Sequence, residues 1–246
     1  MPSSSADDRV LRFAAEQKVH RFTGGRHTTS LRSTGRFKLE DSKCYGWSSA
    51  EACTSASYID AGVLSHLPSG PPSATNIVEL GAGNGALARK LASFGYQVTA
   101  IEPSDDGIKM AQSTASKVRW VHASVYDDLA WTISERFDVA VSTEVVEHLY
   151  RPKELFVRAS ELLHPGGRLI LTTPYHGYLK NLAIALSNKW DAHHDVTWEG
   201  GHIKFFSNQA LKRMAESVGF ERVEFSGLGR LPYLWKSTLM VARRPA

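Results

Sequence analysis

The stretch IVELGAGNGA, residues 77–86, contains the pattern that decides the fold. Its apolar first half is typical of a short buried strand, and its glycines then allow the backbone to turn sharply and approach a ligand closely. Residues 86–94 follow with helical spacing, so the N-terminus of a helix opens on the same turn. The exposed N–H groups of that helix end make the turn a candidate ligand-binding loop.

Two carboxylates lie beside this loop. Glu102 ends the next predicted strand, where a carboxylate can accept hydrogen bonds from both hydroxyls of a ribose. Glu79 lies in the strand that leads into the loop, where it would repel a pyrophosphate but attract an ammonium group, such as that of S-adenosylmethionine. The loop also fits the G-x-G-x-x-A pattern of nicotinamide dinucleotide folds, which is the rival interpretation. The third interpretation of the loop is an ordinary tight turn that binds no ligand.

Strands and helices alternate along most of the chain. Such alternation predicts a Rossmann-like, doubly wound α/β sheet with helices on both faces. We expect residues 1–48 to form a partly flexible N-terminal extension or cap, and residues 49–246 to form the domain, with an insertion on the substrate side at about 174–206. Further strands are expected at 98–101, 118–122, 137–141, 169–172 and near Val223 and Leu239, and helices at 51–66, 105–116, around 155–163 and at 209–218.

The composition is that of a globular protein, with 42% hydrophobic and 22% charged residues in a chain of 246. No apolar run approaches the roughly 18 residues that a membrane-spanning helix needs. The two cysteines, Cys44 and Cys53, exclude a disulfide scaffold and suit a reducing compartment, so we expect a cytoplasmic protein. The Arg- and Ser-rich first 43 residues leave a mitochondrial presequence as the alternative, although Asp7 and Asp8 argue against it.

Several motifs together resemble the class I S-adenosylmethionine-dependent methyltransferases. They are Glu79–Gly85, Glu102, residues 121–127, Phe137-Asp138 and Pro165–Gly167, and the resemblance covers about residues 76–246. It implies an enzyme with a seven-stranded, mostly parallel sheet whose last strand is antiparallel. Many relatives have Asp where Ser124 stands, so a side-chain contact to the adenine is not carried over. The cofactor-binding residues that the resemblance implies are Glu79, Gly81, Gly83, Gly85, Glu102, Ser124, Val125 and Glu144.

The stretch TEVVEHL, residues 143–149, follows the fourth predicted strand. Ligands of a doubly wound sheet bind beyond the carboxyl ends of its strands, so this stretch should lie near the glycine loop. If a helix starts near Glu144, then Glu144, Glu147 and His148 share one face. Two carboxylates and an imidazole can hold a divalent cation such as Mg²⁺ or Zn²⁺. The candidates for a further ligand are His202, His193, His194 and His176.

This stretch and residues 201–207 resemble the ubiquinone-biosynthesis O-methyltransferases. An E-x-x-E-H motif with a later histidine also resembles the small-RNA 3′-terminal 2′-O-methyltransferases, where it holds a divalent metal. Carried over, the metal ligands would be Glu144, Glu147, His148 and His202, and the metal would lower the pKa of a substrate hydroxyl. Many related enzymes carry the motif with no known metal. There, His148 and His202 are the candidate catalytic bases.

The segments 45–51, 174–178 and 190–198 carry aromatic residues and histidines. They predict either walls and a lid for an acceptor or packing of the N-terminal helices on the sheet. The apolar residues of 178–186 favour a helix, which would contact a greasy substrate tail or a membrane edge, or lie in the core. The net charge of +4 is uneven: residues 1–75 contribute +2, residues 76–174 contribute −2 and residues 175–246 contribute +4. An anionic acceptor or a membrane surface fits this distribution.

The leading hypothesis is therefore an S-adenosylmethionine-dependent methyltransferase that modifies a hydroxyl of a small molecule, such as a phenol, a quinol or a related metabolite, with or without a metal. An RNA 2′-O-methyltransferase is an alternative, although no RNA-binding module or dense basic stripe is present in the sequence. Methylation of nitrogen or carbon in a small metabolite is another. A non-catalytic binding protein for S-adenosylmethionine and a nicotinamide oxidoreductase complete the hypotheses.

Overall fold

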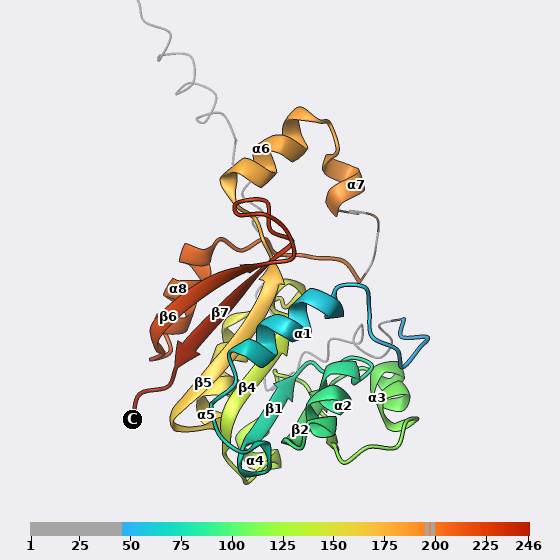
Figure 1. Ribbon diagram of the computed structural model, residues 1–246, viewed down its shortest axis with the longest axis vertical. Helices are drawn as coiled ribbons and strands as arrows, with labels where there is room; N and C mark the ends of the chain where they lie inside the picture. Colours follow the sequence, from blue (N-terminus) through green and yellow to red (C-terminus); the bar gives the residue numbers. More distant parts are fainter. Residues whose placement is uncertain (1–45, 195–196, 198–199) are drawn as a thin grey trace, which may run out of the picture. The chain divides into compact units, whose positions relative to one another are not determined.

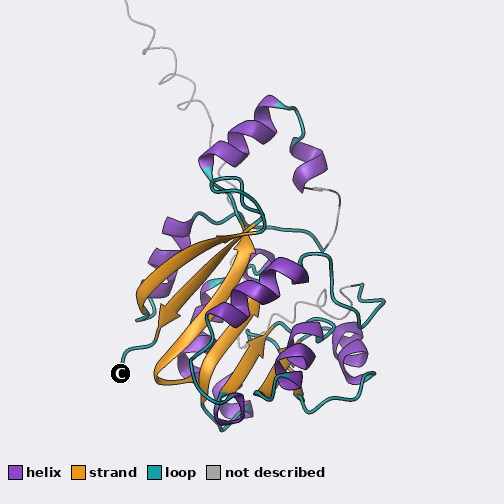
Figure 2. Ribbon diagram, viewed as in Figure 1, coloured by secondary structure: helices purple, strands orange, loops and turns teal. Residues whose placement is uncertain are grey.

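The computed structural model describes residues 46–194, 197 and 200–246 of the chain. They lie in a compact unit that spans Leu39–Ala246. Their strands form one sheet, with helices on both faces (Figures 1 and 2). The strands are β1 (Asn76–Leu80), β2 (Gln97–Glu102), β3 (Arg119–His122), β4 (Phe137–Thr143), β5 (Leu163–Pro174), β6 (Glu221–Leu228) and β7 (Ser237–Arg243).

The helices follow the strands in the alternation that the sequence predicts. No helix in the described part of the chain is long and apolar enough to cross a membrane. The α-helices are α1 (Ala56–Ser65), α2 (Ala86–Ser93), α3 (Asp105–Gln112), α4 (Leu129–Thr132), α5 (Lys153–Leu162), α6 (Tyr178–Leu186), α7 (Trp190–His194) and α8 (Asn208–Glu216), and the 3₁₀ turns are η3 (Pro72–Ala74) and η4 (Val146–His148).

The strand order is β3-β2-β1-β4-β5-β7-β6. Strands β1 to β5 pair in parallel, and β7 is antiparallel to both of its neighbours, β5 and β6. The predicted fold class, a mostly parallel seven-stranded sheet with an antiparallel last strand, is confirmed. The order reverses between β1 and β4, so the chain leaves these two strands in opposite directions. A crevice opens at such a point, beyond the carboxyl ends of the strands.

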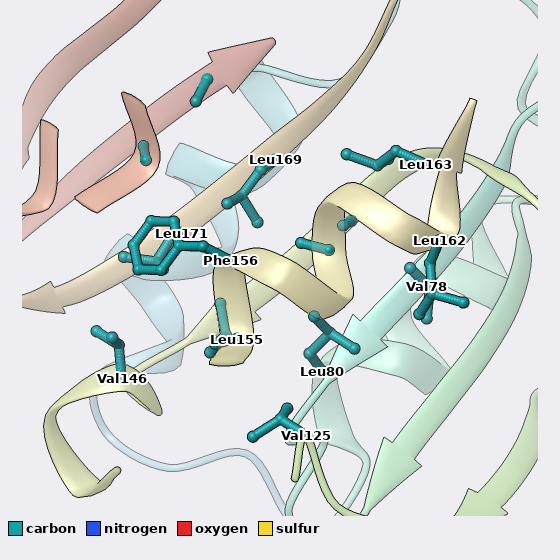
Figure 3. Packing of buried hydrophobic residues seen from close by; sticks show 14 of the residues in the cluster. Val78, Leu80, Val125, Val146, Leu155, Phe156, Leu162, Leu163, Leu169 and Leu171 are labelled. Carbon is teal, nitrogen blue, oxygen red and sulfur yellow. The ribbon is translucent and has the colours of Figure 1, made fainter. Parts of the chain in front are cut away.

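The core lies on both faces of the sheet because successive strand residues point to opposite sides. Val78 and Leu80 of β1 pack with Leu155 and Phe156 of α5 on one face (Figure 3). Ile77 packs on the other face, in a cluster that α1 and α2 complete. Both clusters are built of buried apolar side chains, most of them aliphatic. The alternation also places Glu79 on the same side of β1 as Ile77, beneath α1 and α2.

Three predicted helices differ from the observed ones. The helix expected from residue 51 begins at Ala56, because the residues before it lie along the glycine loop instead. The helix expected at 105–116 ends at Gln112, where the hydroxyl of Ser113 donates to the carbonyl of Met110 and competes with the helical bonds. The helix expected to start near Glu144 does not form: Glu144 has φ of 54°, and only the short turn η4 follows.

Candidate functional site

The glycine loop after β1 is held against β2. The N–H groups of Gly81 and Ala82 both donate to the carbonyl of Ile101, each at 2.9 Å. Gly81 and Gly83 have φ of 80° and 54°, in the left-handed region that residues with a side chain rarely adopt. A Cβ atom at Gly81 would lie 2.6 Å from Val145. The loop after β1 and the loop after β4 therefore touch, and only glycine fits at the point of contact.

Gly85, the third glycine of the loop, lies at the start of α2. It has φ of 77° and caps the start of α2, where a Cβ atom would lie 2.3 Å from the ring of Trp120. Gly85 does not line the cavity described below, although its neighbours Asn84 and Ala86 do. Gly85 thus packs between α2 and β3, and its contact with a cofactor stays a prediction.

Glu102 is fixed at the end of β2 by the loop that it faces. Its Oε2 atom accepts a 2.7 Å hydrogen bond from the N–H of Gly83. Its Oε1 atom accepts hydrogen bonds from the N–H of Ser104, at 2.9 Å, and from the hydroxyl of Ser104. A carboxylate oxygen can accept more than one hydrogen bond, so the buried group keeps capacity for a ligand. The positions of Glu102 and the loop agree with the sequence prediction.

Glu79 is a buried carboxyl group in contact with the same cavity. Its side chain is 2% exposed, and its Oε2 atom has no hydrogen-bond partner among the described residues. Burial, together with repulsion from Asp60 and Glu102, raises the pKa of Glu79 to about 8. Such a site is unfavourable for an anion and favourable for a cationic group of a ligand.

Glu79 should make the ligand-free protein less stable as the pH rises. Its folded-state pKa of about 8 lies above the ordinary value of 4.5, so the stability that the proton supplies is lost between these two pH values. We expect Glu79→Gln to match the parent protein near pH 4.5 and to be roughly 5 kcal/mol more stable above pH 8. Urea unfolding at both pH values measures the difference. Equal stabilities at the higher pH would contradict it.

Ser124 and Val125 follow β3 and line the cavity, and their place beside an adenine stays a prediction. The hydroxyl of Ser124 accepts a hydrogen bond from the N–H of Tyr126 at 3.2 Å, and the Ser124 N–H donates to Asp127 at 2.8 Å. These bonds shape a tight turn at the end of β3. The wall that the turn presents to the cavity is thus defined by backbone geometry as well as by the side chain of Val125.

Glu147, His148 and His202 come together although 54 residues separate the last two. One ligand atom from each lies within 4.8 Å of the other two. The backbone explains the meeting, since the N–H groups of Ile203 and Lys204 both donate to the carbonyl of Glu147 at 3.0 Å. The rings of His148 and His202 are 4.9 Å apart. The segment after α7 is therefore bound to η4.

Glu144, the fourth predicted metal ligand, does not belong to this group. Its Oε1 atom accepts a 2.9 Å hydrogen bond from the hydroxyl of Thr172, which turns the carboxyl group toward β5. Burial raises the pKa of Glu144 to about 7. Glu144 still lines the cavity, beside Val145. Glu144, Glu147 and His148 do not share a helix face, because the backbone of Glu144 has a left-handed conformation and η4 is only a 3₁₀ turn.

The charge states in the group suit a base or a metal ligand. Glu147 is 1% exposed; its Oε2 atom accepts from Thr173 at 3.0 Å, while its buried Oε1 atom has no hydrogen-bond partner among the described residues. Burial and the charge of Glu144 raise the pKa of Glu147. Burial and His202 lower the pKa of His148 to about 4, and burial lowers that of His202. Both imidazoles are therefore neutral at pH 7 and can accept a proton or bind a metal.

The other predicted histidines lie elsewhere. The ring of His194 contacts those of His176 and His193, and the rings of His176 and His194 contact Phe205. None of the three histidines lines the main cavity. They do not join the group of possible metal ligands among the described residues. Tyr178 is 79% exposed, so it forms neither a wall nor a packing contact of the kind expected. Tyr45 and Trp198 lie outside the described residues.

One cavity of about 1200 Å³ connects these features. The glycine loop, Glu79 and Glu102 line one part of it, and Glu144, His148 and His202 line another. The two parts meet where Gly81 faces Val145, at the reversal of strand order. A ligand in the first part would therefore lie beside a second molecule in the other.

Comparison with known proteins decides the family. The family described as methyltransferase domain matches residues 6–224, which is most of the chain. The chain belongs to the methyltransferase domain family. The resemblance to S-adenosylmethionine-dependent methyltransferases noted from the sequence is thereby confirmed at the level of the family, and the interpretation as a nicotinamide oxidoreductase is not supported.

Curated relatives of this methyltransferase domain include ubiquinone biosynthesis O-methyltransferases. One from Azorhizobium caulinodans is 28% identical over 165 residues, which are 64% of this chain and 63% of that protein. The mitochondrial enzyme of Homo sapiens is 30% identical over 167 residues, 64% of this chain and 44% of that protein. The matched region is therefore less than two thirds of the length of either relative.

A solved structure of an S-adenosylmethionine-dependent methyltransferase from Thermotoga maritima has the same fold. The TM-score is 0.55 at 16% sequence identity, and the match covers 75% of this chain and 86% of the solved chain. At this identity the likeness concerns the fold alone. It agrees with the doubly wound sheet described above.

Residues 46–51, expected as a wall of the site or as a packing element, make hydrogen bonds that the sequence did not predict. Residues 46–51 lie along the glycine loop as a strap: the N–H groups of Gly46 and Trp47 donate to Asp106 at 2.6 and 2.7 Å. Asn84 donates to the carbonyls of Ser49 and Glu51 at 2.9 and 2.7 Å. The ring of Trp47 covers Gly83, where a Cβ atom would lie 2.5 Å away. Asn84 within the loop was the one available signal, because its amide needs partners when buried.

Proposed function

We propose that this chain transfers a methyl group from S-adenosylmethionine to a hydroxyl oxygen of a small molecule. The observation that carries the proposal is the shared cavity, in which the orphaned carboxyl oxygen of Glu79 and the fixed carboxylate of Glu102 lie at one end. His148 and His202 line the other end. Family membership and the similarity to the ubiquinone biosynthesis enzymes support the choice of reaction.

The chemistry of the first end suits S-adenosylmethionine. Glu79 would bind its ammonium group, Glu102 would accept from its ribose hydroxyls, and Ser124 with Val125 would border its adenine. The cofactor supplies an activated methyl group on a positively charged sulfur. The acidic lining formed by Glu79, Asp60 and Glu102 favours such a cation over a pyrophosphate.

At the second end, the protein must orient a hydroxyl and accept its proton. Much of the rate of such a transfer comes from holding the reacting atoms in line, which the joined loops after β1 and β4 can do. The Nδ1 atom of His148 lies 3.1 Å from the carbonyl of Gly201, which favours a proton on that nitrogen and leaves Nε2 as the acceptor. His202 stands beside it as a second neutral imidazole.

Glu147, His148 and His202 also fit a divalent cation, and we include one in the proposal. The buried Oε1 atom of Glu147 lacks a hydrogen-bond partner among the described residues and lies 4.0 Å from Nε2 of His202. Two imidazoles and a carboxylate are a donor set that zinc accepts readily, whereas magnesium prefers oxygen ligands. A bound cation would lower the pKa of a coordinated hydroxyl. Three of the four metal ligands predicted from the sequence, all except Glu144, belong to this donor set.

A labelled-methyl screen tests the proposed reaction. The full chain is incubated with methyl-labelled S-adenosylmethionine and a metabolite extract, with and without added Zn²⁺ or Mg²⁺, and the products are identified by mass spectrometry. We expect a labelled methyl ether. A labelled amine or carbon product would replace the oxygen acceptor by another, and label in RNA but not in metabolites would favour the RNA alternative. The Glu102→Gln protein is the control for labelling that does not depend on the site.

A further inference from the structure

A second cavity, of about 300 Å³, is lined by residues of α6, α7, the turn between these helices and the loop that joins β6 to β7. It shares no lining residue with the main cavity. Four of its nine lining residues have basic side chains, and the described residues that line it include no Asp or Glu. The basic residues are Lys180, Lys189, His193 and Arg230.

Lys180 is the most buried of the four, at 7% exposed. Its ammonium group donates to the carbonyls of Tyr175 and Lys236, at 2.9 and 3.4 Å, which hold it between the ends of β5 and β7. Burial and the nearby charge of Arg230 lower the pKa of Lys180. A charge removed from water in this way is costly unless an opposite charge approaches it.

The described residues do not supply that opposite charge inside the cavity. None of the ion pairs that they form includes Lys180, Lys189 or Arg230. The carboxyl group of Glu144 acts on Lys180 from the main cavity, and it also bonds Thr172. A ligand with negative charge would balance several of these cations at once.

The geometry points to an anionic group of the phosphate type as the ligand of this second cavity. Arg230 contributes a planar guanidinium, which matches phosphate oxygens, and the lysines contribute point charges. Ile184 and Leu234 line the same cavity and provide an apolar wall beside the cations. This arrangement is independent of the methyl-transfer proposal.

Two sources can present this chemistry, a soluble phosphomonoester and the headgroup of an anionic phospholipid. The surface around the cavity is apolar: Tyr178 and Leu186 of α6 are each 79% exposed, and Leu231 and Tyr233 of the adjoining loop are 74% and 61% exposed. The predicted apolar helix at 178–186 therefore lies on the surface rather than in the core. The net charge of +4 in residues 175–246 also attracts an anionic ligand.

The experiment uses the full chain and two probes. Glycerol 3-phosphate is titrated by calorimetry, and binding to vesicles of phosphatidylglycerol in phosphatidylcholine is measured by sedimentation. The variants are Arg230→Gln and Lys189→Gln, both at exposed positions, and Lys117→Gln is the matched control that removes one charge outside the cavity. We expect saturable binding of at least one probe that Arg230→Gln weakens by about tenfold.

The two probes separate the sources. Saturable binding of glycerol 3-phosphate that weakens in Arg230→Gln and Lys189→Gln but not in Lys117→Gln supports a soluble phosphomonoester. The same pattern with vesicles alone supports a lipid headgroup. Absence of saturable binding to both probes overturns the proposal, as does an equal loss in all three variants, which would indicate general charge attraction.

Discussion

Replacing Glu147 by glutamine is expected to lower methyl transfer by about 100-fold and to abolish tight binding of Zn²⁺. Glu147 is 1% exposed and supplies a carboxyl oxygen that no described residue satisfies, within 4.8 Å of ligand atoms of His148 and His202. Glutamine keeps the shape and the hydrogen bond from Thr173 but removes the negative charge. Activity with S-adenosylmethionine, and Zn²⁺ titration by calorimetry, are the measurements.

Glu144→Gln is the matched control for this prediction. Glu144 belongs to the same loop after β4 and lines the main cavity, but it lies outside the group formed by Glu147, His148 and His202. We expect Glu144→Gln to keep its affinity for Zn²⁺. Because burial raises the pKa of Glu147, the glutamine variant should unfold at or above the temperature of the parent protein without metal, which excludes misfolding as the cause of lost activity. Full activity and unchanged Zn²⁺ affinity in Glu147→Gln would exclude a metal role for this residue.

Replacing Glu102 by glutamine is expected to weaken binding of S-adenosylmethionine by about 100-fold, as the loss of charge-assisted hydrogen bonds worth about 3 kcal/mol implies. The carboxylate accepts from the N–H groups of Gly83 and Ser104 through different oxygens. Glutamine has one acceptor oxygen, so its NH₂ group would face one of these donors. The variant should lose both the ligand contact and the order of the glycine loop. Calorimetric titration with S-adenosylmethionine measures the affinity.

Glu135→Gln serves as the control for Glu102→Gln. Glu135 is an exposed carboxylate that pairs with Arg119 on the surface, at 2.5 Å, and it does not line the main cavity. Its replacement should leave the affinity for S-adenosylmethionine unchanged. If Glu102→Gln bound S-adenosylmethionine as tightly as Glu135→Gln does, the assignment of Glu102 to the ribose would have to be abandoned.

Local sequence predicted the elements of the sheet more accurately than the details of the site. The apolar runs at 77–80 and 98–101 lie within β1 and β2, because strand formation there depends on nearby apolar residues and turn-forming glycines. Glu102 was also correctly placed beside the glycine loop. The helix expected at Glu144 failed, since the turn after β4 follows the contact between Val145 and Gly81 rather than helical propensity.

The candidate site depends on contacts between distant segments. Spacing within 144–148 suggested that Glu144 would join Glu147 and His148, and the family resemblance added His202. The structure brings His202 to them but not Glu144. Two hydrogen bonds from the backbone of 203–204 to Glu147 create that meeting, and a motif cannot reveal them. The strap at 46–51 is a similar case, because its partners Asn84 and Asp106 lie more than 30 residues away.

By itself, the sequence determined the doubly wound sheet, the glycine loop and the family, since these depend on periodicity and on residue types at short spacing. Tertiary structure decided which carboxyl groups are buried, and therefore the raised pKa of Glu79 and the neutral state of His148. It also decided that Gly85 packs on Trp120 and that α6 displays its apolar residues beside a basic cavity. The reason is physical: burial and charge proximity depend on which segments meet in space, and the free energy of those contacts is not encoded in any one stretch of the chain.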